Sequence, residues 1–217
     1  MKVLVICDDI WHPGEVIARG LAPLADKGID LDVVMDAKDI LVKDMLTEYD
    51  VMIVAKGDAL TGANSQANWF EDEVTAVMPC DIREYIENGG GLIALHAGNC
   101  FRTEKRPDFT AITGNSFIGH PRQCHIDTRF TGDHPILEGV KEFGFRDEHY
   151  QITVEADDIV PLFDTVSESA GTQPGGYVRT LGKGRVCVLT PGHNCAVLRH
   201  PEYQKMLFNA ILWCAGK

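Results

Sequence analysis

Short hydrophobic runs recur through the first hundred residues, and polar residues follow each of them. Their almost continuous apolar character is typical of strands that are buried on both faces of a parallel sheet. The predicted strands are residues 2–7, 29–35, 50–55 and 92–95. Because these strands alternate with helical patterns, the sequence predicts a right-handed, mostly parallel sheet in an α/β protein.

Two helical patterns separate these strands. Pro13 and Gly14 open the first, Pro23 predicts a kink or an early end within it, and Gly28 predicts its stop. The second covers residues 79–88 and places apolar residues at helical spacing before a run of three glycines. Polar and small residues dominate 57–78, so we expect a loop or insertion there.

The second half of the chain predicts mainly strands and turns. Strand patterns cover residues 124–130, 151–154, 159–166, 176–181 and 185–189. The segment Gly182-Lys183-Gly184 suits a hairpin turn, because glycine tolerates positive φ. A final helix begins at Pro201. The sequence has no internal repeat, low-complexity segment or linker, so we expect residues 1–217 to form a single domain.

Length, charge and cysteine content exclude several classes of protein. At 217 residues the chain suits one hydrophobic core, and its net charge of −12 argues against a nucleic-acid surface. No apolar run approaches the roughly 20 residues that span a bilayer, and Asp8 and Asp9 end the first run too early for a signal peptide. The seven cysteines include no C-x-x-C pair. We therefore expect a cytoplasmic protein without membrane contact, zinc ribbon or disulfide framework.

Polar segments directly follow four of the hydrophobic strands. Ligands of open α/β sheets bind beyond the carboxyl ends of the strands, so these segments are candidate site regions. They are residues 8–12, 56–58, 96–99 and 191–194. His96 and His193 lie at two strand exits, and His12 lies just beyond a third.

The histidines at the strand exits are the leading candidates for chemistry. His96 precedes Gly98 at a sharp strand-to-helix turn, which is how many α/β enzymes present a reactive side chain. Imidazole at His193 suits either a base with a near-neutral pKa or a metal ligand. His200 either joins the site or caps the final helix. A buried histidine bonded to the backbone is the structural alternative for His96.

Candidate residues in the middle of the chain are less clear from the sequence. Asp147 and Glu148 form a pair of adjacent carboxylates, usually a solvated turn, but an inward Glu148 can bind a metal or act as a general base. His120 and His134 each precede a proline, which often marks a turn. We favour a structural role for His134 and leave His120 open.

Seven short motifs follow one another along the chain. The segment at 90–96 has the pattern G-G-L-x-x-L-H. The others are Gly119-His120, Asp133-His134-Pro135-Ile136, Asp147-Glu148-x-Tyr150, Gly182-x-Gly184-Arg185-Val186, Pro191-Gly192-His193 and the closing segment 210–215. Together they resemble the trehalose-utilisation (ThuA-like) family over nearly the whole chain.

This resemblance implies a particular fold. The family is similar to class I glutamine amidotransferases, a flavodoxin-like, three-layer sandwich with a mostly parallel central sheet. In those enzymes a cysteine occupies the position of His96. Their catalytic histidine corresponds to His193, and a glutamate occupies the position of Cys195, two residues later. The glutaminase triad is therefore absent. Cys100 lies four residues past the turn and is expected to point elsewhere.

The resemblance also implies a carbohydrate context. We expect an enzyme that acts on a small sugar or keto-sugar by isomerisation, elimination or hydrolysis. The predicted catalytic residues are His96, Glu148, His193 and Tyr150, and the predicted substrate-binding residues are His12, Asn99, His120 and His200. His96 and His193 act as an acid–base pair in one version of this hypothesis and bind a divalent metal such as zinc in the other.

Two other interpretations remain open from the sequence. Without the triad, the chain suits a non-catalytic sugar-sensing or partner-binding module. Alternatively, Cys100 or Cys195 serves as the nucleophile of a cysteine hydrolase. The sequence is also compatible with a homo-oligomer.

Overall fold

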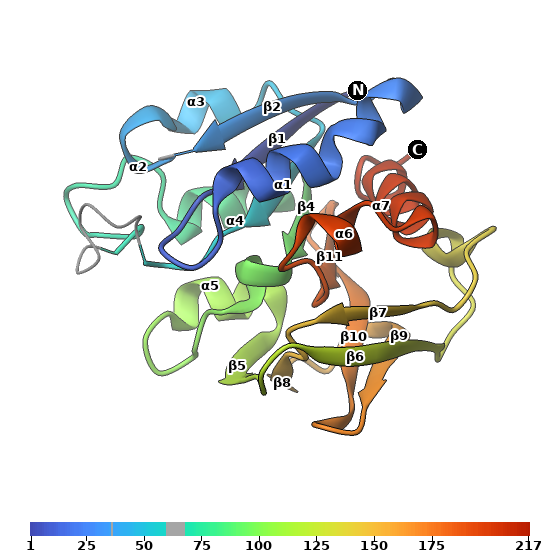
Figure 1. Ribbon diagram of the computed structural model, residues 1–217. Helices are drawn as coiled ribbons and strands as arrows, with labels where there is room; N and C mark the ends of the chain where they lie inside the picture. The colour runs from blue at the N-terminus through green and yellow to red at the C-terminus, as the bar shows by residue number, and fades with distance from the viewer. Residues whose placement is uncertain (36, 60–67) are drawn as a thin grey trace.

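The computed structural model describes residues 1–35, 37–59 and 68–217, which form an α/β fold around one large sheet (Figure 1). The order of strands in this sheet is β2 (Asp30–Met35), β1 (Lys2–Cys7), β3 (Val51–Ala55), β4 (Gly91–Leu95), β11 (Gly184–Leu189), β10 (Gly171–Leu181), β9 (Val160–Ser167), β6 (Cys124–Phe130) and β7 (Gly144–Asp147). All the strands predicted from the sequence are present, with ends that shift by a few residues.

The half of the sheet from β2 to β11 is parallel. β1 pairs with β2 and β3, and β4 pairs with β3 and β11. Alternate residues of a strand face opposite sides of a sheet, so Val3 and Val5 join one hydrophobic cluster while Leu4 joins the other. Both faces are therefore covered, which explains why these strands read as continuous apolar runs.

The other half, from β11 to β7, is antiparallel. The sheet is therefore mixed, which corrects the prediction of a mostly parallel sheet. Short turns join β9 to β10 and β10 to β11, and a turn this short can connect only antiparallel strands. Gly182 has a φ of 58° at the second of these turns, which confirms the predicted hairpin.

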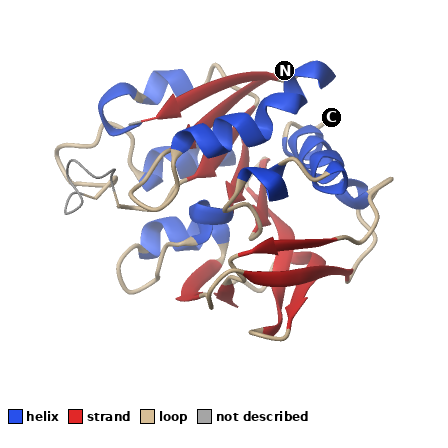
Figure 2. Cartoon of the chain, viewed as in Figure 1, coloured by secondary structure: helices blue, strands red, loops and turns tan. Residues whose placement is uncertain are grey.

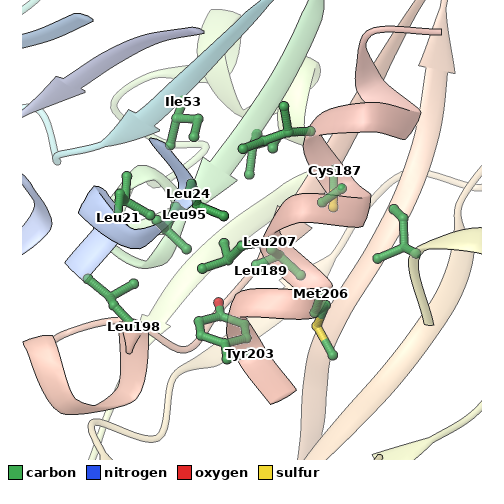
Figure 3. Packing of buried hydrophobic residues seen from close by; sticks show 14 of the residues in the cluster. Leu21, Leu24, Ile53, Leu95, Cys187, Leu189, Leu198, Tyr203, Met206 and Leu207 are labelled. Atoms are coloured by element: carbon green, nitrogen blue, oxygen red, sulfur yellow. The ribbon is translucent and has the colours of Figure 1, made fainter. Parts of the chain in front are cut away.

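Helices cover both faces of the parallel half. On one face, α1 (Gly14–Leu21) and α7 (Pro201–Cys214) pack on the sheet, with Leu21 and Leu207 in the same cluster as Leu95 of β4 (Figure 3). On the opposite face lie α4 (Pro79–Glu87) and α5 (Pro107–Thr113). The antiparallel half consists mainly of strands (Figure 2).

The first helix ends as its sequence predicts. α1 stops at Leu21, and the chain continues as a 3₁₀ helix over Ala22–Lys27, with Pro23 in its first turn. Gly28 then ends this segment with a φ of 82°, a left-handed conformation that costs glycine little. Proline lacks the N–H for the α-helical bond and therefore shortens α1.

Several short elements were not predicted. They are α2 (Ala37–Ile40), α3 (Lys43–Leu46), α5, α6 (Cys195–Leu198), β7 and β5 (Asn115–Gly119). β5 pairs with β8 (Gln151–Val154) in a separate two-stranded sheet. Elements this short carry too few residues for a periodic pattern.

Of the predicted 57–78 insertion, residues 60–67 lie outside the described residues, and Ala59 and Asn68 form an isolated antiparallel bridge. None of the helices in the described ranges has the length and apolar character that a bilayer crossing requires.

Candidate functional site

A pocket of about 940 Å³ lies at the carboxyl ends of the parallel strands. Its wall includes His12 from the segment after β1, Gly57 from the segment after β3, and His193 from the segment after β11. Glu148 and Tyr150, which follow β7, complete its inner part. The pocket therefore lies where open α/β sheets bind their ligands.

Four potential metal ligands meet at this pocket. His12, His96, Glu148 and His193 each offer one donor atom, and these atoms all lie within 4.8 Å of one another. The centroids of the imidazole rings are 5.1 Å apart for His12 and His96, 5.3 Å for His12 and His193, and 5.4 Å for His96 and His193. The three rings thus form a nearly equilateral triangle.

The turn after β4 fixes the position of His96. Its φ is 41°, in the left-handed region that few non-glycine residues adopt. Gly98 follows in the same 3₁₀ turn, where a Cβ atom would lie 2.1 Å from the carbonyl oxygen of Val54. The Nδ1–H of His96 donates to the carbonyl oxygen of Thr190 at 2.8 Å. Because a carbonyl can only accept, Nε2 carries the lone pair, 3.5 Å from Oε2 of Glu148.

His12 is oriented by Asp9, two residues after the end of β1. The Asp9 carboxylate accepts from Nδ1 of His12 at 2.8 and 2.9 Å and from the backbone N–H of Gly57 at 2.7 Å. Burial raises the pKa of Asp9, but the hydrogen bond with His12 and the backbone donors outweigh it and lower the pKa overall. Nε2 of His12 is left facing the pocket, 3.4 Å from the hydroxyl of Tyr150.

Glu148 is the carboxylate shared by the surrounding imidazoles. Its Oε2 lies 3.1 Å from Nδ1 of His193 and 3.5 Å from Nε2 of both His96 and His120. Burial raises the pKa of Glu148, but the nearby imidazoles of His193 and His96 outweigh it and hold the pKa well below its usual value. The same contact raises the pKa of His193, whereas burial lowers that of His96. Glu148 is therefore ionised at neutral pH.

Asp147 anchors the segment that carries His193. Its fully buried carboxylate accepts from the backbone N–H of Gly192 at 2.7 Å and of His193 at 3.3 Å, and from Nδ2 of Asn194 at 3.4 Å. Both members of the Asp147–Glu148 pair thus point inward, one to hold the backbone and one to reach the imidazoles. The site consequently gathers negative charge from Asp9, Asp147 and Glu148.

Tyr150 and Cys100 form the neutral side of the pocket. The Tyr150 ring stacks on His96 with centroids 4.1 Å apart, and its hydroxyl lies 3.0 Å from Sγ of Cys100. Burial raises the pKa of Tyr150 well above its usual value and that of the Cys100 thiol to about 12. Both groups are therefore protonated at neutral pH, so Tyr150 can donate a hydrogen bond and Cys100 is a poor nucleophile.

This arrangement has the features of a metal-binding site. Metal-binding histidines usually donate their second N–H to a carboxylate or a backbone carbonyl, which fixes the tautomer and directs the free lone pair. His12 does so with Asp9, and His96 does so with the carbonyl of Thr190. Three imidazoles and one carboxylate at mutual distances below 4.8 Å could hold a tetrahedral divalent cation.

The whole chain resembles one sequence family. The sequence profile of ThuA, described as trehalose utilisation, matches residues 2–214. The chain belongs to the ThuA family. No curated protein sequence matches this ThuA chain.

Solved structures share the fold of this ThuA protein. A ThuA-like protein from Parabacteroides merdae is similar over 100% of this chain and 91% of its own, with a TM-score of 0.78 and 19% identity. A cytoplasmic protein from Salmonella typhimurium covers 99% of both chains, with a TM-score of 0.70 and 16% identity. A β-galactosidase from Rahnella sp. R3 matches 98% of this chain over 31% of its own length, with a TM-score of 0.65 and 16% identity. At these identities the likeness concerns the fold alone.

The structure brings most of the predicted site residues together. The predicted catalytic residues His96, Glu148, His193 and Tyr150 surround one point. His12, predicted to bind substrate, lies among them as a fourth potential ligand of a metal. His120, also predicted to bind substrate, lines the pocket beside Glu148.

Two predicted substrate-binding residues have structural roles instead. Asn99 is buried, and its amide donates to the carbonyl oxygens of Ala94 and Leu189, so it joins the ends of β4 and β11. His200 caps α7, where its Nδ1 accepts from the backbone N–H of Glu202 at 3.3 Å. Neither side chain lines the pocket. Capping, which the sequence left open for His200, is the correct alternative.

The expected direction of Cys100 is also corrected. The residues after β4 form a 3₁₀ turn over His96–Asn99 rather than the start of an α-helix, so Cys100 lines the pocket instead of pointing away.

Sequence reasoning missed the residues that orient the histidines. Asp9 lies in one of the segments singled out at the strand exits, but nothing in that segment indicated a carboxylate–imidazole pair. Asp147 was recognised only as a neighbour of Glu148. Thr190 acts through its backbone carbonyl, for which a sequence carries no signal.

Proposed function

We propose that this ThuA protein is a metal-dependent enzyme that acts on a sugar or keto-sugar. The convergence of His12, His96, Glu148 and His193, with two of the imidazoles oriented by hydrogen-bonded partners, carries this proposal. The donor set suits zinc or another divalent cation. The description of the family as trehalose utilisation supplies the carbohydrate context.

A bound divalent cation would act as a Lewis acid that polarises a carbonyl or hydroxyl oxygen of the sugar. The residues of the chain supply the remaining functions. The neutral hydroxyl of Tyr150 donates a hydrogen bond to a substrate oxygen beside His12. Glu148, ionised and shared by the imidazoles, balances the positive charge.

His120 is the candidate for proton transfer. Its Nδ1–H donates to the carbonyl oxygen of Pro121 at 2.9 Å, so Nε2 is the basic nitrogen, 3.5 Å from Oε2 of Glu148. Its side chain is 34% exposed, in contrast to the 1% of His96, and can therefore exchange protons with solvent. A base at this place suits proton abstraction beside a keto group, which leads to isomerisation or elimination, or activation of water for hydrolysis.

The same pocket does not support cysteine chemistry. The Cys100 thiol is hydrogen-bonded to Tyr150 rather than to a histidine, and burial keeps it protonated. A thiolate needs a base or a positive neighbour to form at neutral pH. We therefore retain the metal-dependent reaction over the hydrolase that uses Cys100.

Elemental analysis of protein purified without chelator tests the proposal. We expect about one equivalent of a divalent metal in the wild type and its loss in His96→Ala and in His193→Ala, because removal of one ligand weakens a four-ligand site. His125→Ala is the matched control, since His125 is exposed on β6 and pairs with Asp127, away from the pocket. A wild-type protein that binds no metal even after incubation with zinc would overturn the metal-dependent mechanism.

Turnover assays with trehalose and its keto derivatives then separate catalysis from sensing. An enzyme converts one of these sugars and loses this activity after treatment with chelator. Tight binding of a sugar without any turnover would instead favour the non-catalytic sugar-sensing module.

A further inference from the structure

The pocket extends well beyond the cluster of potential metal ligands. Its volume of about 940 Å³ is near the upper end of the range for small-molecule sites, roughly 300–1,000 Å³. The inner end is made by buried side chains, such as His12 at 6% exposure and Tyr150 at 1%. The outer part is lined by residues that the proposed reaction does not use, which include Trp11, Asn68, Arg102 and Lys105.

Trp11 is the most unusual of these outer residues. Its side chain lines the pocket and is 70% exposed, although it directly precedes the buried His12. Its backbone N–H donates to the Asp9 carboxylate at 2.8 Å, so the main chain is fixed while the indole remains uncovered. By contrast, Trp69 is fully buried and stacks on Phe70. An exposed indole in the wall of a pocket offers a flat apolar face that a bound ligand can cover.

Polar groups in the wall of the same pocket indicate what kind of ligand would cover the indole. Arg102 gives one hydrogen bond to the carbonyl oxygen of Ile118 at 3.3 Å, and in the described part of the chain no carboxylate lies within ion-pair distance of Arg102 or Lys105. Their remaining N–H groups, with the amide of Asn68, are therefore available to a ligand. A flat aromatic surface and several hydrogen-bonding groups in the wall of one pocket match a pyranose ring, which has apolar C–H faces and a polar hydroxyl rim.

We infer that the outer part of the pocket is a second sugar subsite in which Trp11 stacks on a pyranose ring. This inference rests on the proposed function, in which the first sugar unit occupies the inner part beside His12 and Tyr150. The substrate is then a glycoside of at least two rings rather than a free monosaccharide. Trp11 determines this specificity by binding the second ring, and it takes no part in the chemical step.

Calorimetric titration of the full chain with trehalose and with glucose tests the second subsite. We expect the wild type to bind trehalose at least about tenfold more tightly than glucose, since covering an aromatic side chain removes a large apolar area from water. Trp11→Ala should lose this advantage while its affinity for glucose stays the same. Trp11→Phe, which keeps an aromatic face, should stay within about threefold of the wild type for trehalose.

A matched control and a separate measurement distinguish failure of the second sugar subsite from failure of the proposed metal-dependent function. Val160→Ala removes another exposed hydrophobic side chain, 50% exposed on β9 and outside the pocket, and should bind both sugars like the wild type. Metal content of the same preparations reports on the proposed function, and Trp11→Ala should keep its metal because Ala retains the backbone bond to Asp9. Wild-type protein that binds trehalose no more tightly than glucose, or Trp11→Ala that binds trehalose like the wild type, would overturn the subsite whatever the metal content.

Discussion

His96 shows how one residue combines strain and function. A non-glycine residue in the left-handed region costs roughly 1–3 kcal/mol and persists only where the surrounding structure over-determines it. At His96 the hydrogen bond to Thr190 and the packing of Gly98 against Val54 hold the turn. The result is an imidazole fixed at the end of β4, with its Nε2 3.5 Å from Oε2 of Glu148.

Asp9 has a comparable role for His12, and its substitution gives a prediction at the scale of one residue. Asp9→Asn keeps an oxygen acceptor but removes the negative charge that polarises the imidazole. We expect metal affinity to fall by about 10- to 100-fold, as is usual when a carboxylate behind a metal-binding histidine is lost. Competition with a chromophoric chelator measures this change.

The neighbouring carboxylate supplies the control for this experiment. Asp8→Asn alters a side chain that accepts from the backbone N–H of Gly14 and has no bond to His12. Its metal affinity should therefore match that of the wild type. Equal affinity of Asp9→Asn and the wild type would show that Asp9 only holds the loop.

At the scale of elements, the two halves of the sheet supply different parts of the site. The parallel half presents His12, His96 and His193 at the ends of its strands. The antiparallel half contributes Glu148, directly after β7. Asp147 at the end of β7 binds the segment after β11, and this contact joins the halves at the pocket. Each half alone would lack one part of the donor set.

A short 3₁₀ helix beside α7 gives a prediction of pH dependence. His134 precedes this helix (Pro135–Leu137), and its Nδ1 accepts from the backbone N–H of Ile136 at 3.2 Å. Burial, with a smaller effect of Arg185, lowers the pKa of His134 from 6.5. As the pH falls, His134 therefore takes up a proton at a higher pH in the unfolded chain than in the folded protein. The stability due to neutral His134 is complete above pH 6.5 and is lost as the pH falls through the folded pKa.

Replacement of His134 by a residue that does not titrate tests this dependence. Asn accepts a hydrogen bond at the same kind of position, so His134→Asn keeps the cap and removes the proton uptake. Between pH 7 and pH 5 the free energy of unfolding should fall less steeply in His134→Asn than in the wild type. Urea unfolding at pH 7, 6 and 5 measures both slopes, and parallel slopes would contradict the assignment.

At the scale of the whole molecule, the donor set links distant parts of the chain. The four residues lie at positions 12, 96, 148 and 193, and they come together only in the folded state. A ligand that binds the folded state alone stabilises it by about 2.7 kcal/mol at a concentration 100 times its Kd. A cation bound here would therefore oppose unfolding of both halves together.

Thermal unfolding with and without zinc measures this effect. For a chain of this length we expect saturating zinc to raise the Tm of metal-free protein by about 5–10 °C, and excess chelator to reverse the rise. His193→Ala, which lacks one ligand, should show little or no shift. An equal rise in wild type and His193→Ala would place the stabilising zinc at another site.

The sequence by itself determined the local elements and the identity of the reactive side chains. Continuous apolar runs predicted β1, β3 and β4, because a strand buried on both faces must be apolar throughout. The rule that ligands lie beyond strand ends singled out His12 and His96 from their positions after β1 and β4, and His193 from its position after β11. These inferences depend on residue type and periodicity alone.

Tertiary structure decided which of these residues meet. In sheet order β7 lies four places from β11, yet Asp147 at its end binds Gly192 beyond β11. Only the course of the twisted sheet brings these segments together, and no sequence period encodes it. The same holds for Asn99, whose amide donates to the carbonyl oxygens of Ala94 and Leu189, and for His200, whose Nδ1 accepts from the backbone N–H of Glu202. Only the folded chain brings these groups into contact. Residue type states what a side chain can do, and its neighbours in space decide whether it does so.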